Sequence, residues 1–335
     1  MKNIISVLTL VLFISGCKAQ EAQQSTFDPI VQRARETSLF AEEVDWDSVN
    51  ARFVELTKGK ETVEGRKAGL QYLINSLGDK HAAFRSAKDH SMIVWYTGKS
   101  EGTDNRDGAF INSVINDITA EFSYKRLDNG VGYLKVVGIG GGDMQAQADA
   151  IRKGLKDLKG AGVNKWILDL RYNGGGNMNP MIAGLAPLLG KGFVGGSVNL
   201  KNERFQTFEI KKGQFFDTGR QVCEMDAEPT IGANEKVAVL LSRYTTSSGE
   251  LVAVAFKGRA NTRFIGEETS GYTTVNGYDK VTDDLIMLIS QAVYIDRNEK
   301  RYDEKVGVDE AMEFQHTTEI EGDKQVARAI EWLEE

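Results

Sequence analysis

Short apolar segments alternate with helical patterns along the middle of this chain, and this alternation constrains its fold most. The apolar run Trp166–Leu170 leads into a glycine-rich loop and then a helical pattern from about Asn179. The same order recurs where the run Val237–Leu241 precedes a turn and a helical segment at 251–257. Short apolar runs bounded by turns are typical of buried strands. Strands that alternate with helices predict an α/β layered core.

Other segments fit the same interpretation. The turn signal Asn129-Gly130 leads into a predicted strand at 132–137. Another strand is predicted at 263–266, and a hairpin over 284–302. Residues 191–233 are less regular and compatible with short strands. We therefore expect these segments to belong to the same layered core.

The residues before this region are predicted to be helical. An amphipathic stripe at i, i+3, i+4 and i+7 is formed by Leu70, Leu73, Ile74 and Leu77. Gly78 follows directly and is a typical helix stop. We expect residues 27–88 to form a small N-terminal helical domain and residues 89–335 to form the α/β domain, which closes with a helix.

The first residues have the pattern of an export signal. Lys2 is followed by an apolar run at 4–14 that is too short to span a bilayer comfortably. The following Ile14-Ser15-Gly16-Cys17 resembles the lipobox of bacterial lipoproteins. That resemblance implies removal of residues 1–16, lipid such as palmitate on Cys17, and a tether at 17–26. The chain would then be held at a membrane of the cell envelope, periplasmic or surface-facing. Plain secretion with cleavage near Ala19 is the alternative.

Composition excludes some functions. The net charge is −7 and no basic run stands out, which argues against a nucleic-acid partner. Cys17 and Cys223 are the only cysteines, so acylation of Cys17 would leave Cys223 without a disulfide partner. No group of cysteines and histidines has metal-ligand spacing, so we predict neither a metal nor another cofactor.

Ser247 lies at the turn between a predicted buried strand and a helix. A residue there meets the N-terminal amides of the helix, which favour a developing negative charge. That position suits a nucleophile whose attack creates an oxyanion. However, Ser247-Ser248-Gly249-Glu250 also fits S-x-x-E, the pattern of an N-terminal capping box. From this segment alone the capping box is favoured.

A serine nucleophile needs a base, which is usually histidine. The chain has three histidines. His81 follows a predicted helix end and the residues Asp79 and Lys80, whereas His90 and His316 lie in polar stretches typical of the surface. A single histidine is more often structural than catalytic, so His81 alone is a weak indication.

The predicted strand at 166–170 delivers the chain into three consecutive glycines at 174–176. Glycines allow backbone N–H groups to approach a ligand closely. An oxyanion hole is one interpretation, and a phosphate loop or a plain tight turn is the other. The segment is not G-x-G-x-x-G and lacks the Gly-Lys-Ser/Thr end of a P-loop, which argues against nucleotide binding.

Several segments, taken in order, resemble motifs of the S41 peptidases, the tail-specific or carboxyl-terminal processing group. They span about 65–312. The matching segments are Leu77–Phe84 ("LGDxHxxF"), Gly132–Leu134 ("GYl"), Ile167–Gly176 ("ILDLRxNxGG"), Thr246–Glu250 ("T-S-S-x-E"), Ile265–Gly271 ("iGexTxG") and Glu304–Asp309 ("Exx-GV-xPD"). This resemblance implies a ClpP/crotonase-like α/β core behind the small helical domain, and serine peptidase activity on a peptide or protein.

The resemblance also assigns residues. One branch of the family uses a Ser–Lys dyad, but Tyr272 stands at the position of its lysine. The branch that resembles the tricorn core instead implies Ser247 as nucleophile, His81 as general base and then acid, and Glu304 as the residue that orients the imidazole.

In the same branch, the implied oxyanion donors are the N–H of Ser248 and that of a loop glycine, with Gly175 expected. The reaction would proceed through a covalent acyl-enzyme that water releases.

The chain also departs from the family. Processing peptidases carry a PDZ module between the "GDxH" segment and the central strand, but residues 85–131 are too few for a domain of roughly 80–100 residues. Strict tail specificity is therefore not implied. A non-catalytic protein that binds a small hydrophobic ligand or peptide on the same scaffold is the alternative function, and a structural lipoprotein with a decayed site is another.

Overall fold

A computed structural model describes residues 27–98, 122–226, 231–232, 234–317 and 319–335. A six-stranded sheet forms the central layer, with the strand order β17-β11-β10-β5-β4-β3. All neighbours in this sheet are parallel except β3, which runs antiparallel to β4. The strands are β3 (Ser123–Arg126), β4 (Gly132–Lys135), β5 (Lys165–Asp169), β10 (Lys236–Leu241), β11 (Thr262–Gly266) and β17 (Glu310–Ala311). The predicted α/β core is confirmed.

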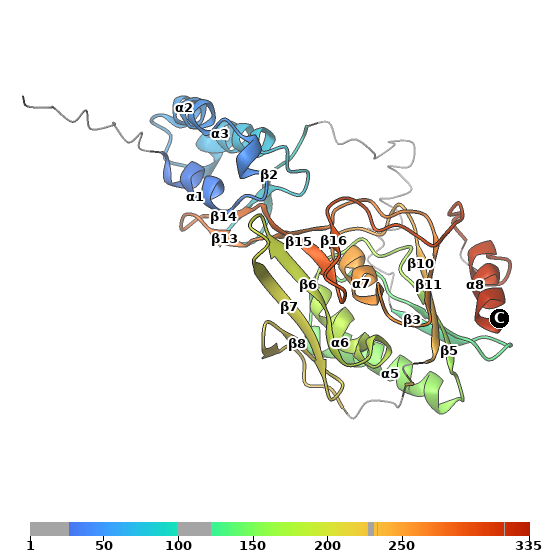
Figure 1. Cartoon of the computed structure of the whole chain (residues 1–335). Helices are drawn as coiled ribbons and strands as arrows, with labels where there is room; N and C mark the ends of the chain where they lie inside the picture. The colour runs from blue at the N-terminus through green and yellow to red at the C-terminus, as the bar shows by residue number, and fades with distance from the viewer. Residues whose placement is uncertain (1–26, 99–121, 227–230, 233, 318) are drawn as a thin grey trace, which may run out of the picture.

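Helices cover both faces of this sheet (Figure 1). The larger apolar core lies between the sheet and three helices, α5 (Met144–Gly160), α6 (Met178–Leu189) and α7 (Ser248–Phe256). The closing helix α8 (Lys324–Glu334) packs on the opposite face against β10, β5 and β11. Apolar residues of the parallel strands are buried on both faces, as expected for strands between two helical layers.

A second, mainly antiparallel sheet packs against α6 and α7, in the order β12-β15-β6-β7-β8-β9, with β16 on β15. Its strands are β12 (Thr274–Asn276), β15 (Ser290–Asp296), β6 (Gly192–Asn199), β7 (Arg204–Lys211), β8 (Gln214–Asp217), β9 (Arg220–Gln221) and β16 (Arg301–Tyr302). Of the expected irregular stretch 191–233, residues 192–221 are thus more regular than expected. Paired glycines inside β6 weakened the strand pattern, and their absent side chains allow the backbone of Gln206 and Ile295 to approach.

The N-terminal region contains the helices α1 (Pro29–Thr37), α2 (Trp46–Thr57) and α3 (Val63–Ser76), with a 3-10 turn η1 (Ala41–Glu43). The predicted apolar stripe is buried, and the helix stops at the predicted place, where Gly78 has φ 66°. Two strands follow, β1 (Ala83–Ser86) and β2 (Met92–Trp95).

A later part of the chain completes this N-terminal unit. The strands β13 (Asp279–Lys280) and β14 (Leu285–Leu288) join β1 and β2 in a four-stranded sheet, and Leu285, Met287 and Ile289 enter the helical core. The predicted hairpin over 284–302 therefore divides: β14 belongs to this sheet, whereas β15 and β16 pair in the second sheet. The division at residue 88 remains a prediction.

Candidate active site

Ser247 occupies the corner between β10 and α7, with φ 53° and ψ −116°. These angles belong to the first central residue of a type II′ turn, where glycine is favoured. A non-glycine residue held there costs about 1–3 kcal/mol and persists only where its surroundings fix it. Strained strand-to-helix turns of this kind present nucleophilic serines in other hydrolases. The strain at Ser247 therefore points to a function.

Glu250 fixes this corner. Its buried carboxylate accepts the N–H of Ser247 at 2.8 Å, which completes the predicted capping box. The same carboxylate accepts the N–H groups of Gly271 at 2.8 Å and Tyr272 at 2.7 Å, and the hydroxyl of Thr269 at 2.5 Å. Burial raises the pKa of Glu250, and these hydrogen bonds oppose the shift. Glu250 therefore ties the Ser247 corner to the segment before β12.

The imidazole of His81 faces Ser247. Its Nε2 lies 3.2 Å from the Oγ of Ser247, although the two residues are 166 positions apart. His81 lies in the turn between α3 and β1, and its own N–H donates to Asp79 Oδ1 at 3.0 Å. Asn276 on β12 donates its Nδ2 to the His81 carbonyl at 3.0 Å. The structure thus brings together the two residues that the sequence predicts as nucleophile and base.

Thr274 occupies the position expected for Glu304. The Nδ1 of His81 lies 3.0 Å from Thr274 Oγ1. Glu304 is exposed in the turn after β16, and its backbone carbonyl accepts the hydroxyl of Thr273 at 2.6 Å. A carboxylate in such a turn stays hydrated, and moving it beside the imidazole would require desolvation. Thr274, and not Glu304, is the side chain that the structure places at His81 Nδ1, so the expected orienting role of Glu304 remains a prediction that this geometry does not support.

The surroundings of His81 favour the neutral imidazole. Burial lowers its pKa, and the positive charge of Lys80 acts in the same direction. The charge of Asp79 and a hydrogen bond with Thr274 oppose this, but the pKa stays below its ordinary value of 6.5. At neutral pH the ring is uncharged, which is the form that accepts a proton.

The glycine loop lies directly against Ser247. Gly175 has φ 95°, and a Cβ on it would lie 2.9 Å from the Thr246 carbonyl oxygen and 3.0 Å from the Ser247 Cβ. Only glycine fits there. Its N–H already donates to Asn173 Oδ1 at 3.0 Å. The N–H of Ser248, in the first turn of α7, has no hydrogen-bond partner among the described residues. Of the two expected oxyanion donors, Ser248 is the one available.

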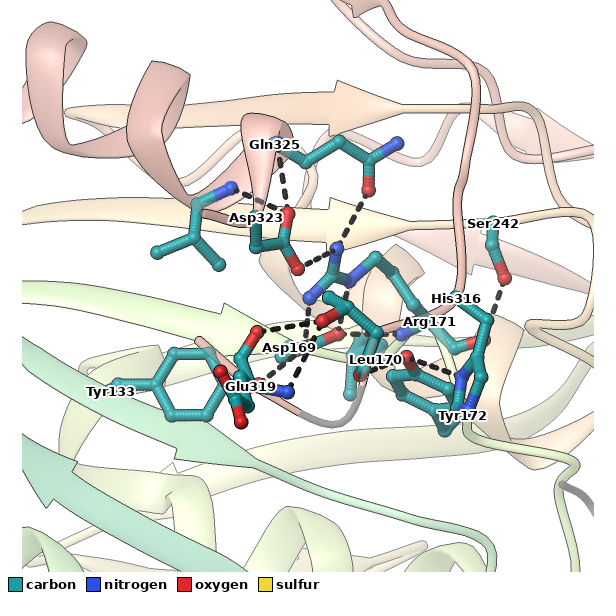
Figure 2. A network of polar contacts seen from close by, with 12 residues as sticks. Tyr133, Asp169, Leu170, Arg171, Tyr172, Ser242, His316, Glu319, Asp323 and Gln325 are labelled. Atoms are coloured by element: carbon teal, nitrogen blue, oxygen red, sulfur yellow. Dashed lines mark hydrogen bonds and ion pairs between the residues drawn. The ribbon is translucent and has the colours of Figure 1, made fainter. Parts of the chain in front are cut away.

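A buried ion network anchors the loop behind the site (Figure 2). The Arg171 guanidinium makes two contacts with Asp169, at 2.9 and 2.7 Å, and contacts Asp323 at 2.7 Å and Gln325 at 3.0 Å. The Tyr133 hydroxyl donates to Asp169 at 2.5 Å. Burial acts to raise the pKa of Asp169, but the Arg171 charge and these hydrogen bonds outweigh it and hold the pKa below its ordinary value.

Two loops that meet at Ser247 are fastened to each other next to this network. Ser242 donates its hydroxyl to the Arg171 carbonyl at 2.6 Å, and Thr245 donates to the Leu170 carbonyl at 2.9 Å. Both donors belong to the loop after β10, and both acceptors to the loop after β5. Because adjacent parallel strands end at the same sheet edge, these bonds set the distance between Gly175 and Ser247.

A cavity of about 450 Å³ lies beside the glycine loop. Gly138, Ile139, Asp143 and Gln147 are among the residues that line it. Gly138 packs on the loop so closely that a Cβ there would lie 2.9 Å from the Gly175 carbonyl oxygen. The cavity therefore adjoins the glycine loop through Gly138 and is of a size that accepts a side chain.

The other histidines lie elsewhere. His90 is exposed and its Nδ1 lies 2.5 Å from the Tyr278 hydroxyl, while His316 Nδ1 lies 3.1 Å from the Tyr172 hydroxyl. Within the described ranges no group of three or more His, Cys, Asp or Glu residues could hold a metal ion. Cys17 and the predicted signal lie outside the described residues. Within the described residues, no helix is long and apolar enough to cross a membrane.

Sequence reasoning missed three polar residues of the site. Thr274 and Ser290 belong to no local pattern, because isolated hydroxyl residues in strands carry no signal of their own. Asp79 lies directly after a helix end and two residues before the histidine, and this place is the one signal that could have identified it.

Comparisons with known proteins show which family this chain resembles. A model of peptidase family S41 matches residues 130–314, more than half of the chain. The nisin-resistance protein of Lactococcus lactis subsp. lactis is 27% identical over 303 residues, which cover 89% of this chain and 83% of that protein.

Solved structures show the same fold at low identity. A lipoprotein from Streptococcus agalactiae has a TM-score of 0.68 at 20% identity, covering 91% of this chain and 93% of that one. The photosystem II D1 C-terminal processing protease has a TM-score of 0.58 at 13% identity, covering 88% and 94%. The predicted mixed α/β fold of an S41 peptidase is thus confirmed.

Proposed function

The chain belongs to peptidase family S41, and we propose that it is a serine-type peptidase with Ser247 as nucleophile and His81 as base. The observation that carries the proposal is the 3.2 Å separation of Ser247 Oγ and His81 Nε2. That distance is within reach of a hydrogen bond in an enzyme without substrate. The pKa of His81, held low by burial, supports the same role.

The reaction follows from this geometry. Ser247 Oγ attacks the carbonyl carbon of a peptide bond while its proton passes to His81 Nε2. The tetrahedral intermediate collapses, the C–N bond breaks, and the imidazolium gives the proton to the leaving amine. Water then attacks the ester, loses a proton to His81, and releases the acid as the proton returns to Ser247 Oγ.

The oxyanion of the tetrahedral intermediate needs fixed donors. We assign the Ser248 N–H as the first donor, because it lies next to the nucleophile at the positive end of α7. The loop around Gly175 forms the other wall and admits the carbonyl oxygen because it has no side chain. The adjoining cavity would take a substrate side chain.

A fluorophosphonate probe tests the proposal on the full chain. We expect labelling of the wild-type protein, none in Ser247→Ala, and a rate lower by about 10²–10⁴-fold in His81→Ala. His90→Asn is the matched control, because it removes an exposed histidine with φ 60°, which asparagine tolerates. Absence of labelling from pH 6 to 9, or labelling that survives in Ser247→Ala, would overturn the proposal.

If the wild-type protein is labelled, mass spectrometry of digested peptides would define the substrate. Nisin is included among these peptides because of the name of the Lactococcus lactis relative.

The alternative is a binding protein for a small hydrophobic ligand or peptide. The cavity of about 450 Å³ beside the glycine loop is the observation that favours it. This function predicts saturable binding of a fluorescent hydrophobic probe that is unchanged in Ser247→Ala, together with no labelling of the wild-type serine.

For localisation, we propose cleavage before Cys17 and a lipid anchor at the cell envelope. The lipobox supports this proposal, and so does the structural similarity to a lipoprotein from Streptococcus agalactiae. Metabolic incorporation of an alkyne-labelled palmitate should be lost in Cys17→Ala, with the protein moving to the soluble fraction. Incorporation that persists in Cys17→Ala, or a soluble wild type, would favour plain secretion.

A further inference from the structure

Asp79 is a buried carboxylate that reaches His81 through two hydroxyl groups. Its side chain is 1% exposed and accepts the backbone N–H of Ser290 at 2.7 Å and the N–H of His81 at 3.0 Å. Ser290 Oγ lies 2.9 Å from Asp79 Oδ1 and 2.7 Å from Thr274 Oγ1. Thr274 Oγ1 in turn lies 3.0 Å from His81 Nδ1. The four residues form a continuous path that ends at Ser247.

The carboxylate sets the direction of every proton along this path. An ionised Asp79 can only accept, and each hydroxyl has one proton to donate. If Ser290 donates to Asp79, its oxygen must accept from Thr274. Thr274 has then used its proton and must accept from His81 Nδ1.

The consequence falls on the other nitrogen of the ring. With the proton of the neutral imidazole on Nδ1, Nε2 is bare and faces the Ser247 hydroxyl at 3.2 Å. This is the tautomer that can act as a base. Asn276 Oδ1, at 3.4 Å from Ser290 Oγ, is a longer and neutral alternative acceptor, so the charged Asp79 is favoured.

We propose that Thr274 and Ser290 are positioning residues that relay the charge of Asp79 to His81 and thereby fix its tautomer. This rests on the proposed function of Ser247 and His81. It replaces the direct carboxylate of a Ser-His-Asp triad by a carboxylate and two hydroxyls. When His81 becomes an imidazolium during acylation, the ordered dipoles and the negative charge stabilise it.

Thr274 allows a nearly isosteric test. Thr274→Val keeps the β-branched shape on β12 but removes the hydroxyl, whereas Thr274→Ser keeps the hydroxyl. Ser290→Ala cuts the path at its second link and leaves the two backbone donors of Asp79 in place. Glu61→Gln is the control, because this carboxylate is exposed before α3 and lies outside the path.

We expect the second-order labelling rate and kcat/KM to fall about 10- to 100-fold in Thr274→Val and Ser290→Ala. The loss should appear in kcat, with KM unchanged. Thr274→Ser and Glu61→Gln should stay within about 3-fold of wild type. Because both substitutions cut one path, the double variant should lose no more than the worse single variant.

Two outcomes would overturn the relay. One is a Thr274→Val variant equal to wild type, which would mean that the hydrogen bond donated by the imidazole to the Thr274 backbone carbonyl suffices. The other is a double variant whose loss is the product of the single losses. Both require a wild-type protein that is labelled at Ser247, so they are distinct from failure of the proposed function, in which the wild type is not labelled at all.

Discussion

The ring of Tyr272 packs edge-on against the imidazole of His81, with ring centroids 5.3 Å apart and planes at 83°. On its other side, Lys80 Nζ lies 4.7 Å from the Tyr272 ring centroid. Burial lowers the pKa of Lys80. Tyr272 stands where the Ser–Lys branch of the family would carry its lysine. In this chain the residue at that position therefore packs against the imidazole and does not supply an amine base.

Removing the Tyr272 ring should weaken catalysis moderately. An edge-to-face aromatic pair contributes about 0.5–1.5 kcal/mol, so Tyr272→Ala should lower kcat/KM by roughly 2- to 12-fold as His81 gains rotational freedom. Tyr272→Phe keeps the ring and should match wild type. Steady-state kinetics on a cleaved peptide would check this, and equal losses in both variants would show that the hydroxyl matters instead.

The acid limb of the pH profile should reflect His81. Because burial lowers its pKa, the imidazole stays neutral to a lower pH than a free histidine, and activity should rise with pH through a midpoint below about 6.5. The labelling rate measured from pH 4.5 to 8 gives this midpoint. A midpoint above 6.5 would mean that the negative charge of Asp79 outweighs burial.

Gly175→Ala should abolish most activity. The new Cβ would lie within 3.0 Å of the Ser247 Cβ and would also strain a backbone at φ 95°, so we expect a loss of at least about 10²-fold in kcat/KM. Gly162→Ala is the matched control: its φ is 85°, but nothing lies within 4 Å of the added Cβ. It should lose stability without losing activity, and comparable inactivation of both variants would contradict a specific role for Gly175.

The network behind the loop should matter mainly for stability. Arg171→Leu would leave Asp169 and Asp323 buried without their cation, at a cost of about 3–5 kcal/mol in the free energy of unfolding. Tyr133→Phe removes one hydrogen bond to Asp169 and should cost about 1–3 kcal/mol. Urea unfolding followed by circular dichroism measures both, and a neutral Arg171→Leu would show that the pairs do not offset their own desolvation.

Local patterns in the sequence determined a good part of this protein. The apolar runs at 166–170 and 237–241, and the helical stripe ending at Leu77, predicted the strands and helices that carry the loops of the site. The order of short motifs identified Ser247 and His81. These patterns can be recognised in the sequence because strands and helices depend on residues that are close together along the chain.

Tertiary structure alone decided the partners of these residues. Thr274 meets His81 across 193 positions and Ser290 meets Asp79 across 211 positions, and residues 279–289 complete the core of the N-terminal helices. Glu304, which a motif favoured, lies in an exposed turn. Hydrogen bonds between side chains that are distant in sequence depend on how the strands pair and how the sheets pack. A single threonine or serine creates no sequence pattern that would predict such a bond.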